Sequence, residues 1–273
     1  FENNFRIATT TRDFSGFEGT SSNNLYVINN NLNVVGKLEN IAPGETIYSA
    51  RFMGEKAYLV TFKKIDPFFV IDLSNPSEPR ILGKLKIPGY SDYLHPYDEN
   101  HIIGVGKETA EANEEFGGDF AWYQGLKIAI FDVSDVSNPI ELHKVVIGDR
   151  GTDSYALHNH KAFLFDKEKQ LLVLPILLAE IKNKETAEPF TQGEYLFQGA
   201  YVYKINLDNG FELKGRITHY ESDNAFKKSG YYFEGDYDIQ RSLYINNVLY
   251  TLSQKKIQLH DLKDLEKVNE MVF

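Results

Sequence analysis

One short unit recurs along this chain and restricts its fold more than any other feature. Its plainest copies are FFVIDLSNPSEPRILGKLKI at residues 68–87 and IAIFDVSDVSNPIELHKVVI at residues 128–147. Each copy reads as an apolar strand, a polar turn and a second strand. In every copy the first strand ends at an Asp or Asn, which serves as an anchor for aligning the repeats. The anchors are Asn29, Asp72, Asp132, Asn206 and Asp261.

Two further strands precede most of the anchors. They form pairs such as IYSARFM with AYLVTF, and RSLYI with VLYTLS, each joined by a short polar turn. Such pairs are typical of β-hairpins. Four antiparallel strands per repeat, at roughly 40–50 residues plus insertions, indicate the blade of a β-propeller. We therefore predict an all-β fold, a β-propeller of four-stranded antiparallel blades with about five blades. The predicted blades are residues 1–42, 43–88, 89–148, 149–218 and 219–273.

The first repeat lacks its innermost strand. FENNFRIATT already reads as a second strand, and LYVIN and VVGKLENI follow as the third and fourth. A second strand without an inner neighbour would leave a sheet edge open. We therefore expect the chain to be part of a larger propeller, with the missing N-terminal part of that propeller as a partner. The alternative is a closed five-blade ring in which a strand from elsewhere fills the gap.

Charge and composition limit the classes of partner. The net charge of −10 argues against nucleic acid, whose phosphates require Lys and Arg. The chain has 19 Phe and 17 Tyr, a richness that favours strands. No run approaches the roughly 18 apolar residues of a membrane helix. The absence of Cys excludes disulfides and thiolate chemistry, and the common nucleophile, phosphate-loop and zinc-protease motifs are missing.

Several blocks resemble a known family. FFVIDLSNPSEPRILGKLKIPG and IAIFDVSDVSNPIELHKVVIG are similar to propeller repeats of the LVIVD type. The stretch from FRIATT to AYLVTF, with GYSDYLHPYDENHIIGVGK and RSLYINNVLYTLS, resembles a family of secreted proteins with a C-terminal β-propeller distantly related to WD repeats. The resemblance covers nearly the whole chain. It implies an extracellular or cell-surface location and carries over no catalytic residue.

The insertions of this propeller are expected on one face. Residues 10–24, 107–125 and 179–199 lie between second and third strands, and residues 148–154 and 219–238 join blades. Long loops on a rigid scaffold usually bind ligands, although insertions also accumulate on whichever face tolerates them. Within the second of these loops, residues 107–115 lack an apolar face but could form one helical turn.

Acidic and aromatic residues gather in these loops and predict the ligand. Carboxylates beside aromatic rings suit a sugar ring, a cationic ligand or a protein hot spot. Alternatively, the rings fasten the loops to the blades while the acids are solvated. Phe120, Phe190, Phe197, Tyr220 and Phe233 belong to the same loops. The predicted ligand-binding residues are Glu114, Glu115, Asp119, Trp122, Tyr123, Tyr195, Tyr231 and Tyr232.

A second candidate site is the polar cluster that opens the fourth blade. Asp149 and Asp153 precede His158 and His160, which would point to one side if they lie on an innermost strand. Two imidazoles and a carboxylate could bind Zn²⁺, and the two aspartates with backbone carbonyls could bind Ca²⁺. The ordinary alternative is that these side chains line the channel mouth and form hydrogen bonds.

The sequence thus favours a non-enzymatic extracellular module that binds a protein or polysaccharide ligand through its acidic–aromatic face. The competing hypothesis is a metal-assisted hydrolase or glycan-active enzyme that uses the channel mouth around Asp153, His158 and His160.

Overall fold

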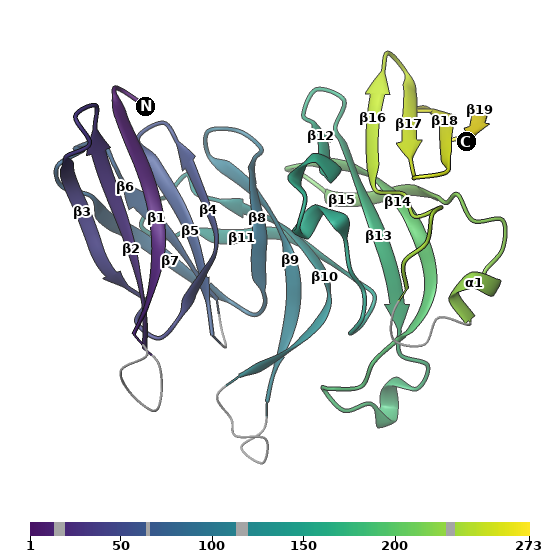
Figure 1. Ribbon diagram of the computed structural model, residues 1–273, viewed down its shortest axis with the longest axis horizontal. Helices are drawn as coiled ribbons and strands as arrows, with labels where there is room; N and C mark the ends of the chain where they lie inside the picture. Colours follow the sequence, from purple (N-terminus) through teal and green to yellow (C-terminus); the bar gives the residue numbers. More distant parts are fainter. Residues whose placement is uncertain (14–19, 64–65, 113–119, 228–232) are drawn as a thin grey trace. The chain divides into compact units, whose positions relative to one another are not determined.

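The computed structural model describes residues 1–13, 20–63, 66–112, 120–227 and 233–273 (Figure 1). Within these ranges the chain is almost entirely antiparallel β-structure, arranged as one three-stranded and four four-stranded sheets. The predicted all-β propeller of four-stranded blades, with a first blade that lacks its innermost strand, is confirmed.

Each sheet is formed by strands consecutive in sequence. The first contains β1 (Asn4–Asp13), β2 (Thr20–Asn29) and β3 (Val34–Ile41); the second contains β4 (Thr46–Met53), β5 (Lys56–Phe62), β6 (Asp66–Asp72) and β7 (Arg80–Ile87). The third contains β8 (Tyr90–Pro96), β9 (His101–Glu111), β10 (Ala121–Asp132) and β11 (Ile140–Ile147). The fourth contains β12 (Leu164–Asp166), β13 (Leu171–Glu180), β14 (Glu194–Asn206) and β15 (Gly210–Ile217); the fifth contains β16 (Arg241–Ile245), β17 (Val248–Leu252), β18 (Lys256–Asp261) and β19 (Lys267–Val272).

Helical structure is confined to short pieces. They are η2 (Tyr155–Leu157), η3 (His160–Ala162), η4 (Lys184–Thr186) and α1 (Asn224–Lys227). The helical turn considered for residues 107–115 is wrong for residues 107–111, which extend β9 and pair with β10 through the antiparallel ladder. None of these helices, within the part of the chain that is described, is long and apolar enough to span a membrane.

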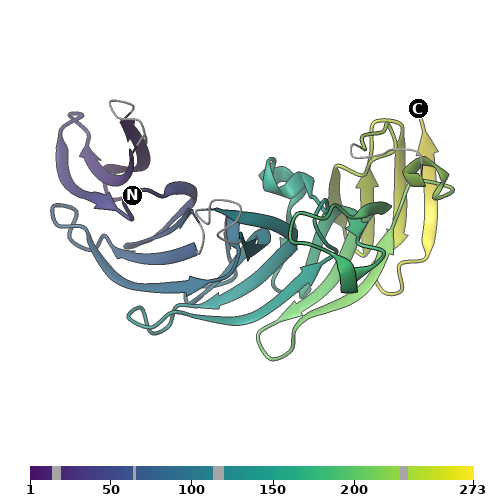
Figure 2. The same cartoon turned by 90° about the horizontal axis from the view of Figure 1, so that it is seen from below.

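Burial falls from the second strand of a sheet to its last. β5 is buried at nearly every position, because both of its faces pack against apolar side chains. β19 is exposed throughout and forms the outer edge of the last sheet, drawn in yellow in Figure 2. In the neighbouring strand β18, buried positions alternate with partly buried ones. Such a decrease in burial is expected for a blade whose middle strands contribute most of the apolar core.

The chain divides into two compact units. The first is Phe1–Trp122 with Ala129–Leu142, and the second is Tyr123–Ile128 with His143–Phe273. In the first, an aromatic core joins the second and third sheets: Phe68 stacks on Phe131 with ring centroids 4.8 Å apart. In the second, a core that includes Val173, Val202 and Leu249 joins the fourth and fifth sheets.

All five repeat anchors have the same structural role. Asp72 and Asp132 accept the backbone N–H two residues ahead, from Ser74 at 2.9 Å and from Ser134 at 2.8 Å. Hydrogen bonding to the side chains of Ser74 and Ser134, and then to these backbone N–H groups, lowers the pKa of both carboxyls. Asn29, Asn206 and Asp261 accept the equivalent bond. Asp72 and Asp132 therefore cap their turns, and the anchors are scaffold residues.

Candidate functional site

The inner edge of the fourth sheet differs from the sequence prediction. His158 and His160 were expected on one innermost strand, but His158 ends η2 and His160 begins η3, and β12 starts only at Leu164. The reason is local, because the Ser154 side chain accepts the N–H of Ala156 and the Asn159 side chain accepts that of Lys161. Such hydrogen bonds from side chains to the backbone compete with the backbone hydrogen bonds of a β-strand.

The four predicted metal ligands are not brought together. Asp149 accepts the N–H of Ile181 at 2.8 Å and pairs with Lys184 at 2.9 Å, which fixes its carboxylate in the loop after β13. Asp153 pairs with Leu177 of β13 through two backbone hydrogen bonds, while His158 and His160 are exposed. Over the described ranges, no three His, Asp or Glu side chains form a group that could hold a metal ion. The four-residue metal site is therefore not assembled.

Two of these residues line a different site. Asp153 and His158 lie on the wall of a cavity of about 240 Å³ in the second unit. The wall is completed by the end of β13, the start of β14 and the segment before β16. The remaining lining residues are Ser154, Tyr155, Leu177, Gln198, Phe233, Glu234 and Asp238. We call this cavity the Asp238 pocket.

Asp238 is the most unusual group of this pocket. Its side chain is only 2% exposed. One carboxylate oxygen accepts the Tyr220 hydroxyl at 2.7 Å, and the other accepts the N–H of Gly235 at 3.1 Å and, more weakly, the Tyr155 hydroxyl at 3.5 Å. Burial raises the pKa of Asp238, and these three hydrogen bonds oppose the rise only in part.

The described surroundings of Asp238 provide no counter-ion. Its donors are two neutral hydroxyls and one backbone amide. Glu234 lines the same pocket and raises the Asp238 pKa further by repulsion, after the effect of burial. A buried carboxylate is ordinarily paired with a cation, because burying an isolated charge costs several kcal/mol. Among the described residues, the Asp238 carboxylate is therefore hydrogen-bonded by neutral donors alone.

The segment that carries Asp238 is held in place by backbone and amide contacts. Gln198 of β14 donates to the carbonyl of Ile239 at 2.9 Å and accepts its N–H at 2.9 Å. Gln198 is buried, and this two-bond clamp resembles a strand pairing. It fixes the residue next to Asp238 and thereby fixes the direction of the carboxylate.

Aromatic rings surround the pocket. Phe233, on its wall, contacts Tyr195, Tyr220 and Phe226, with ring centroids 6.2, 5.6 and 4.8 Å apart. Tyr195 comes from β14, Tyr220 from the turn after β15 and Phe226 from α1, so residues distant in sequence form one cluster. Burial raises the pKa of Tyr195, and the charge of Asp153 raises it further. Tyr195 therefore lies close enough to the pocket for the charge of Asp153 to affect its pKa.

Of the other predicted ligand-binding residues, Trp122 and Tyr123 make contacts outside this cluster. Trp122 packs edge-to-face on Phe120 at 4.9 Å, and the carbonyl of Tyr123 accepts a hydrogen bond from Arg150 at 3.1 Å. The remaining predictions lie outside the described residues and stay predictions. They are Glu114, Glu115, Asp119, Tyr231 and Tyr232.

Sequence reasoning missed the residue at the centre of the site. It singled out Tyr195, Tyr220 and Phe233, and it placed the loop 219–238 on the inserted face, but it did not single out Asp238. The available signal was the run FEGDYD immediately before the RSLYI strand, which combines acids and aromatic rings. Burial of Asp238 depends on contacts with Tyr220 and Tyr155, which are distant in sequence.

Comparison with known proteins gives a family and two relatives of appreciable identity. Residues 1–265 match the family described as a beta propeller domain. An uncharacterised protein of Methanocaldococcus jannaschii is 36% identical over 268 residues, which are 98% of this chain and 35% of that protein. An uncharacterised protein of Archaeoglobus fulgidus is 33% identical over 266 residues, 97% of this chain and 33% of that protein. The chain thus spans about a third of the length of these relatives.

Solved structures give weaker similarity. Kluyveromyces lactis Hsv2 has a TM-score of 0.41 at 11% identity, covering 93% of this chain and 60% of that one. The WD40 domain of SCAP from fission yeast has a TM-score of 0.41 at 9% identity, covering 93% and 53%. A putative dipeptidyl aminopeptidase IV from Bacteroides ovatus reaches 0.49 at 9% identity, covering 99% and 38%. These scores lie below 0.5, so no conclusion about function rests on them.

Proposed function

Because this chain belongs to the family of beta propeller domains, we propose that it is a binding module whose ligand inserts a cationic group into the Asp238 pocket. The observation that carries the proposal is a carboxylate, 2% exposed, that is bonded only to neutral donors among the described residues and lines an open cavity. A cation in this cavity would supply the counter-ion. It would also form charge-assisted hydrogen bonds, which are roughly twice as strong as neutral ones.

The aromatic cluster supports the same class of ligand. The faces of Phe, Tyr and Trp rings attract cations, and a desolvated cation–π contact contributes about 2 kcal/mol. Phe233 supplies such a ring at the pocket wall, and Tyr195 and Tyr220 hold Phe233 in place. Acids and rings together distinguish a cation site from a purely apolar pocket.

The volume of the pocket restricts the size of the inserted group. At about 240 Å³ it is smaller than the roughly 300–1,000 Å³ of sites that enclose drug-sized molecules. It suits a single Lys or Arg side chain of a protein partner, or a small amine. The ligand of the proposed module is therefore a basic segment of another protein, bound by one inserted side chain.

The proposed location is outside the cell or on its surface. The support is the resemblance of the FRIATT to AYLVTF stretch and of the repeat units to secreted propeller proteins. Protease treatment of intact producing cells tests this part, because a surface protein is digested while a cytosolic marker survives. Digestion only after cell lysis would contradict it.

Titration of the pocket with a cationic probe tests the binding function. Arginine methyl ester is the probe, methyl glucoside is the sugar control, and affinity is measured by calorimetry or by shifts of aromatic NMR signals. We expect the arginine ester to bind the wild-type chain. Asp238→Asn should weaken it about 10- to 100-fold, since hydrogen bonds to charged groups contribute about 1.5–3 kcal/mol.

Two controls make this test decisive. Glu212→Gln changes an exposed carboxylate on β15 and should leave binding unchanged. Thermal melting should show Asp238→Asn to be at least as stable as wild type, because the substitution removes a buried charge. Binding of the sugar but not of the arginine ester, or equal binding by wild type and Asp238→Asn, would refute the proposal.

A further inference from the structure

A second cavity in the same unit is lined by a buried lysine. It also measures about 240 Å³, and its walls include His219, Tyr220, Glu221, Ser222, Tyr237 and Lys256. Tyr220 connects the two cavities, because it lines this one while its hydroxyl donates to Asp238 in the other. We call this cavity the Lys256 pocket.

Lys256 is a buried cation whose ion pair with Glu270 is long. The residue is only 6% exposed and begins β18. Its ammonium lies 3.8 Å from the nearest paired carboxylate oxygen, that of Glu270, beyond hydrogen-bond distance. It also lies 5.5 Å from the centre of the Tyr237 ring, which attracts it weakly. An ammonium has three donors, and in the described chain neither contact satisfies any of them with a hydrogen bond.

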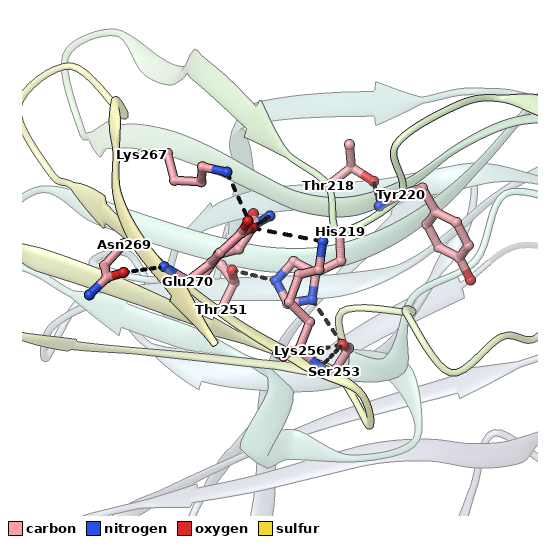
Figure 3. Close-up of polar contacts among 10 residues, drawn as sticks. Thr218, His219, Tyr220, Thr251, Ser253, Lys256, Lys267, Asn269 and Glu270 are labelled. Carbon is pink, nitrogen blue, oxygen red and sulfur yellow. Dashed lines mark hydrogen bonds and ion pairs between the residues drawn. The ribbon is translucent and has the colours of Figure 1, made fainter. Parts of the chain in front are cut away.

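Glu270 is engaged elsewhere. Its carboxylate pairs with Lys267 at 3.2 Å (Figure 3). It also accepts a hydrogen bond from Gln258 at 3.2 Å. The hydrogen bonds from Lys267 and Gln258 lower the pKa of Glu270. The carboxylate oxygen that pairs with Lys267 also lies 3.8 Å from Lys256, so Glu270 is shared between the two lysines.

His219 forms a neutral wall beside Lys256. One ring nitrogen contacts the Ser253 hydroxyl at 2.9 Å and the other contacts the Thr251 hydroxyl at 2.9 Å, as Figure 3 shows. Burial lowers the pKa of His219 to about 4, and the Lys256 charge contributes. The imidazole is thus uncharged at neutral pH, with both nitrogens occupied. Lys256 is left as the one buried cation among the residues that line this cavity.

We propose that the Lys256 pocket binds a carboxylate, with the Lys256 ammonium as its counter-ion. A monoanion fits because the lining residues offer a single lysine, and the exposed Glu221 repels a dianion such as phosphate more strongly than a monoanion. The carboxylate site stands on its own geometry. Together with the proposed cation site across Tyr220, it indicates a partner segment that carries a basic and an acidic side chain close together.

Two probes measured against two variants separate the pockets. Acetate tests the carboxylate site, and arginine methyl ester tests the Asp238 pocket. We expect acetate to shift the NMR signals of the Lys256 and Tyr237 side chains in the wild-type chain. Lys256→Met should weaken the binding of acetate at least tenfold and leave the binding of the arginine ester unchanged. Asp238→Asn should weaken the binding of the arginine ester and leave the binding of acetate unchanged. Failure of the cation site alone would therefore leave the carboxylate result standing.

The matched control is Lys255→Met, which removes an exposed lysine from the adjacent position and should retain acetate binding. If Lys256→Met does not fold, as shown by its melt, Lys256→Gln and the wild-type NMR shifts decide the question. The proposal is overturned if acetate leaves the Lys256 signals unmoved or binds the variant as well as wild type. It is also overturned if inorganic phosphate binds more tightly than acetate.

Discussion

The protonation of His219 makes the stability of the folded chain depend on pH. In the folded chain burial lowers its pKa to about 4, whereas an unfolded histidine titrates near 6.5. Between these values the unfolded state binds the proton and the folded state does not. The stability contributed by neutral His219 is therefore complete above pH 6.5 and is lost as the pH falls toward 4. Its size is about 3 kcal/mol, since one pKa unit corresponds to about 1.36 kcal/mol.

We predict that His219→Gln flattens this part of the pH profile. The measurement is the free energy of unfolding from urea denaturation at pH 7 and at pH 5 for both chains. The variant should be less stable at pH 7, because hydrogen bonds to Thr251 and Ser253 are altered, yet lose less on acidification. His158→Gln, at an exposed position, is the matched control. An unchanged slope in His219→Gln would contradict the prediction.

Individual residues were the least predictable part of the chain. Patterns of acids and rings predicted Tyr195 as a ligand-binding residue and placed Tyr220 and Phe233 in the same group of loops, because aromatic side chains in long loops are uncommon without a packing or binding role. The same patterns could not separate Asp238 from Asp236, two positions apart, of which only Asp238 is 2% exposed and bonded to Tyr220. Burial of a charge is decided by tertiary contacts, and a single sequence does not show them.

The outer strands are joined to the neighbouring turns by close backbone approach. A Cβ on Gly36 of β3 would lie 2.0 Å from the carbonyl oxygen of Pro76, and one on Gly83 of β7 would lie 2.2 Å from that of Val136. Pro76 and Val136 belong to the turns that follow the anchors Asp72 and Asp132. In the next repeat His143 takes the corresponding position, and its imidazole contacts the carbonyl of Leu207 at 2.7 Å. The repeated turn thus packs each blade against the preceding one.

We predict that Gly83→Ala destabilises the chain by about 1–3 kcal/mol, the usual cost of inserting a methyl group into a packed site. The neighbour is backbone, which cannot move aside like a flexible side chain. Thermal or urea unfolding measures the loss. Lys84→Ala, at the exposed adjacent position of the same strand, should cost much less. If the two substitutions lowered the free energy of unfolding equally, the close approach of Gly83 to the Val136 carbonyl would make no special contribution to stability.

Strands and their order were predictable where apolar alternation is strong. The hairpins and the outer strands after each anchor follow from period-two patterns and turn residues. The prediction failed at the start of the fourth blade, where HKAFLF reads as a strand but Asn159 and Ser154 cap two short helical turns. It also took the insertions for loops, whereas β9, β10, β13 and β14 extend into them as longer ladders.

At the scale of the whole molecule, the first of the described sheets has three strands where the others have four, and β1 forms its edge. β1 aligns with the second strand of the other repeats, yet the three-stranded first sheet pairs it only with β2 along its length. A strand with unpaired N–H and C=O groups is a template for another strand. Phe5 adds a large ring, 61% exposed, to this edge. The missing inner strand was predictable from the sequence because the repeat count left no segment to supply it.

We therefore predict that the isolated 273-residue chain self-associates through β1. Sedimentation velocity over a concentration series should show association in the micromolar to roughly millimolar range. Phe5→Lys should reduce it at least tenfold, because a charge on an edge opposes strand pairing. Leu32→Lys alters an apolar side chain, 84% exposed, in the β2–β3 turn and should not. A chain that stays monomeric throughout, or equal effects of both substitutions, would show that this edge does not drive pairing.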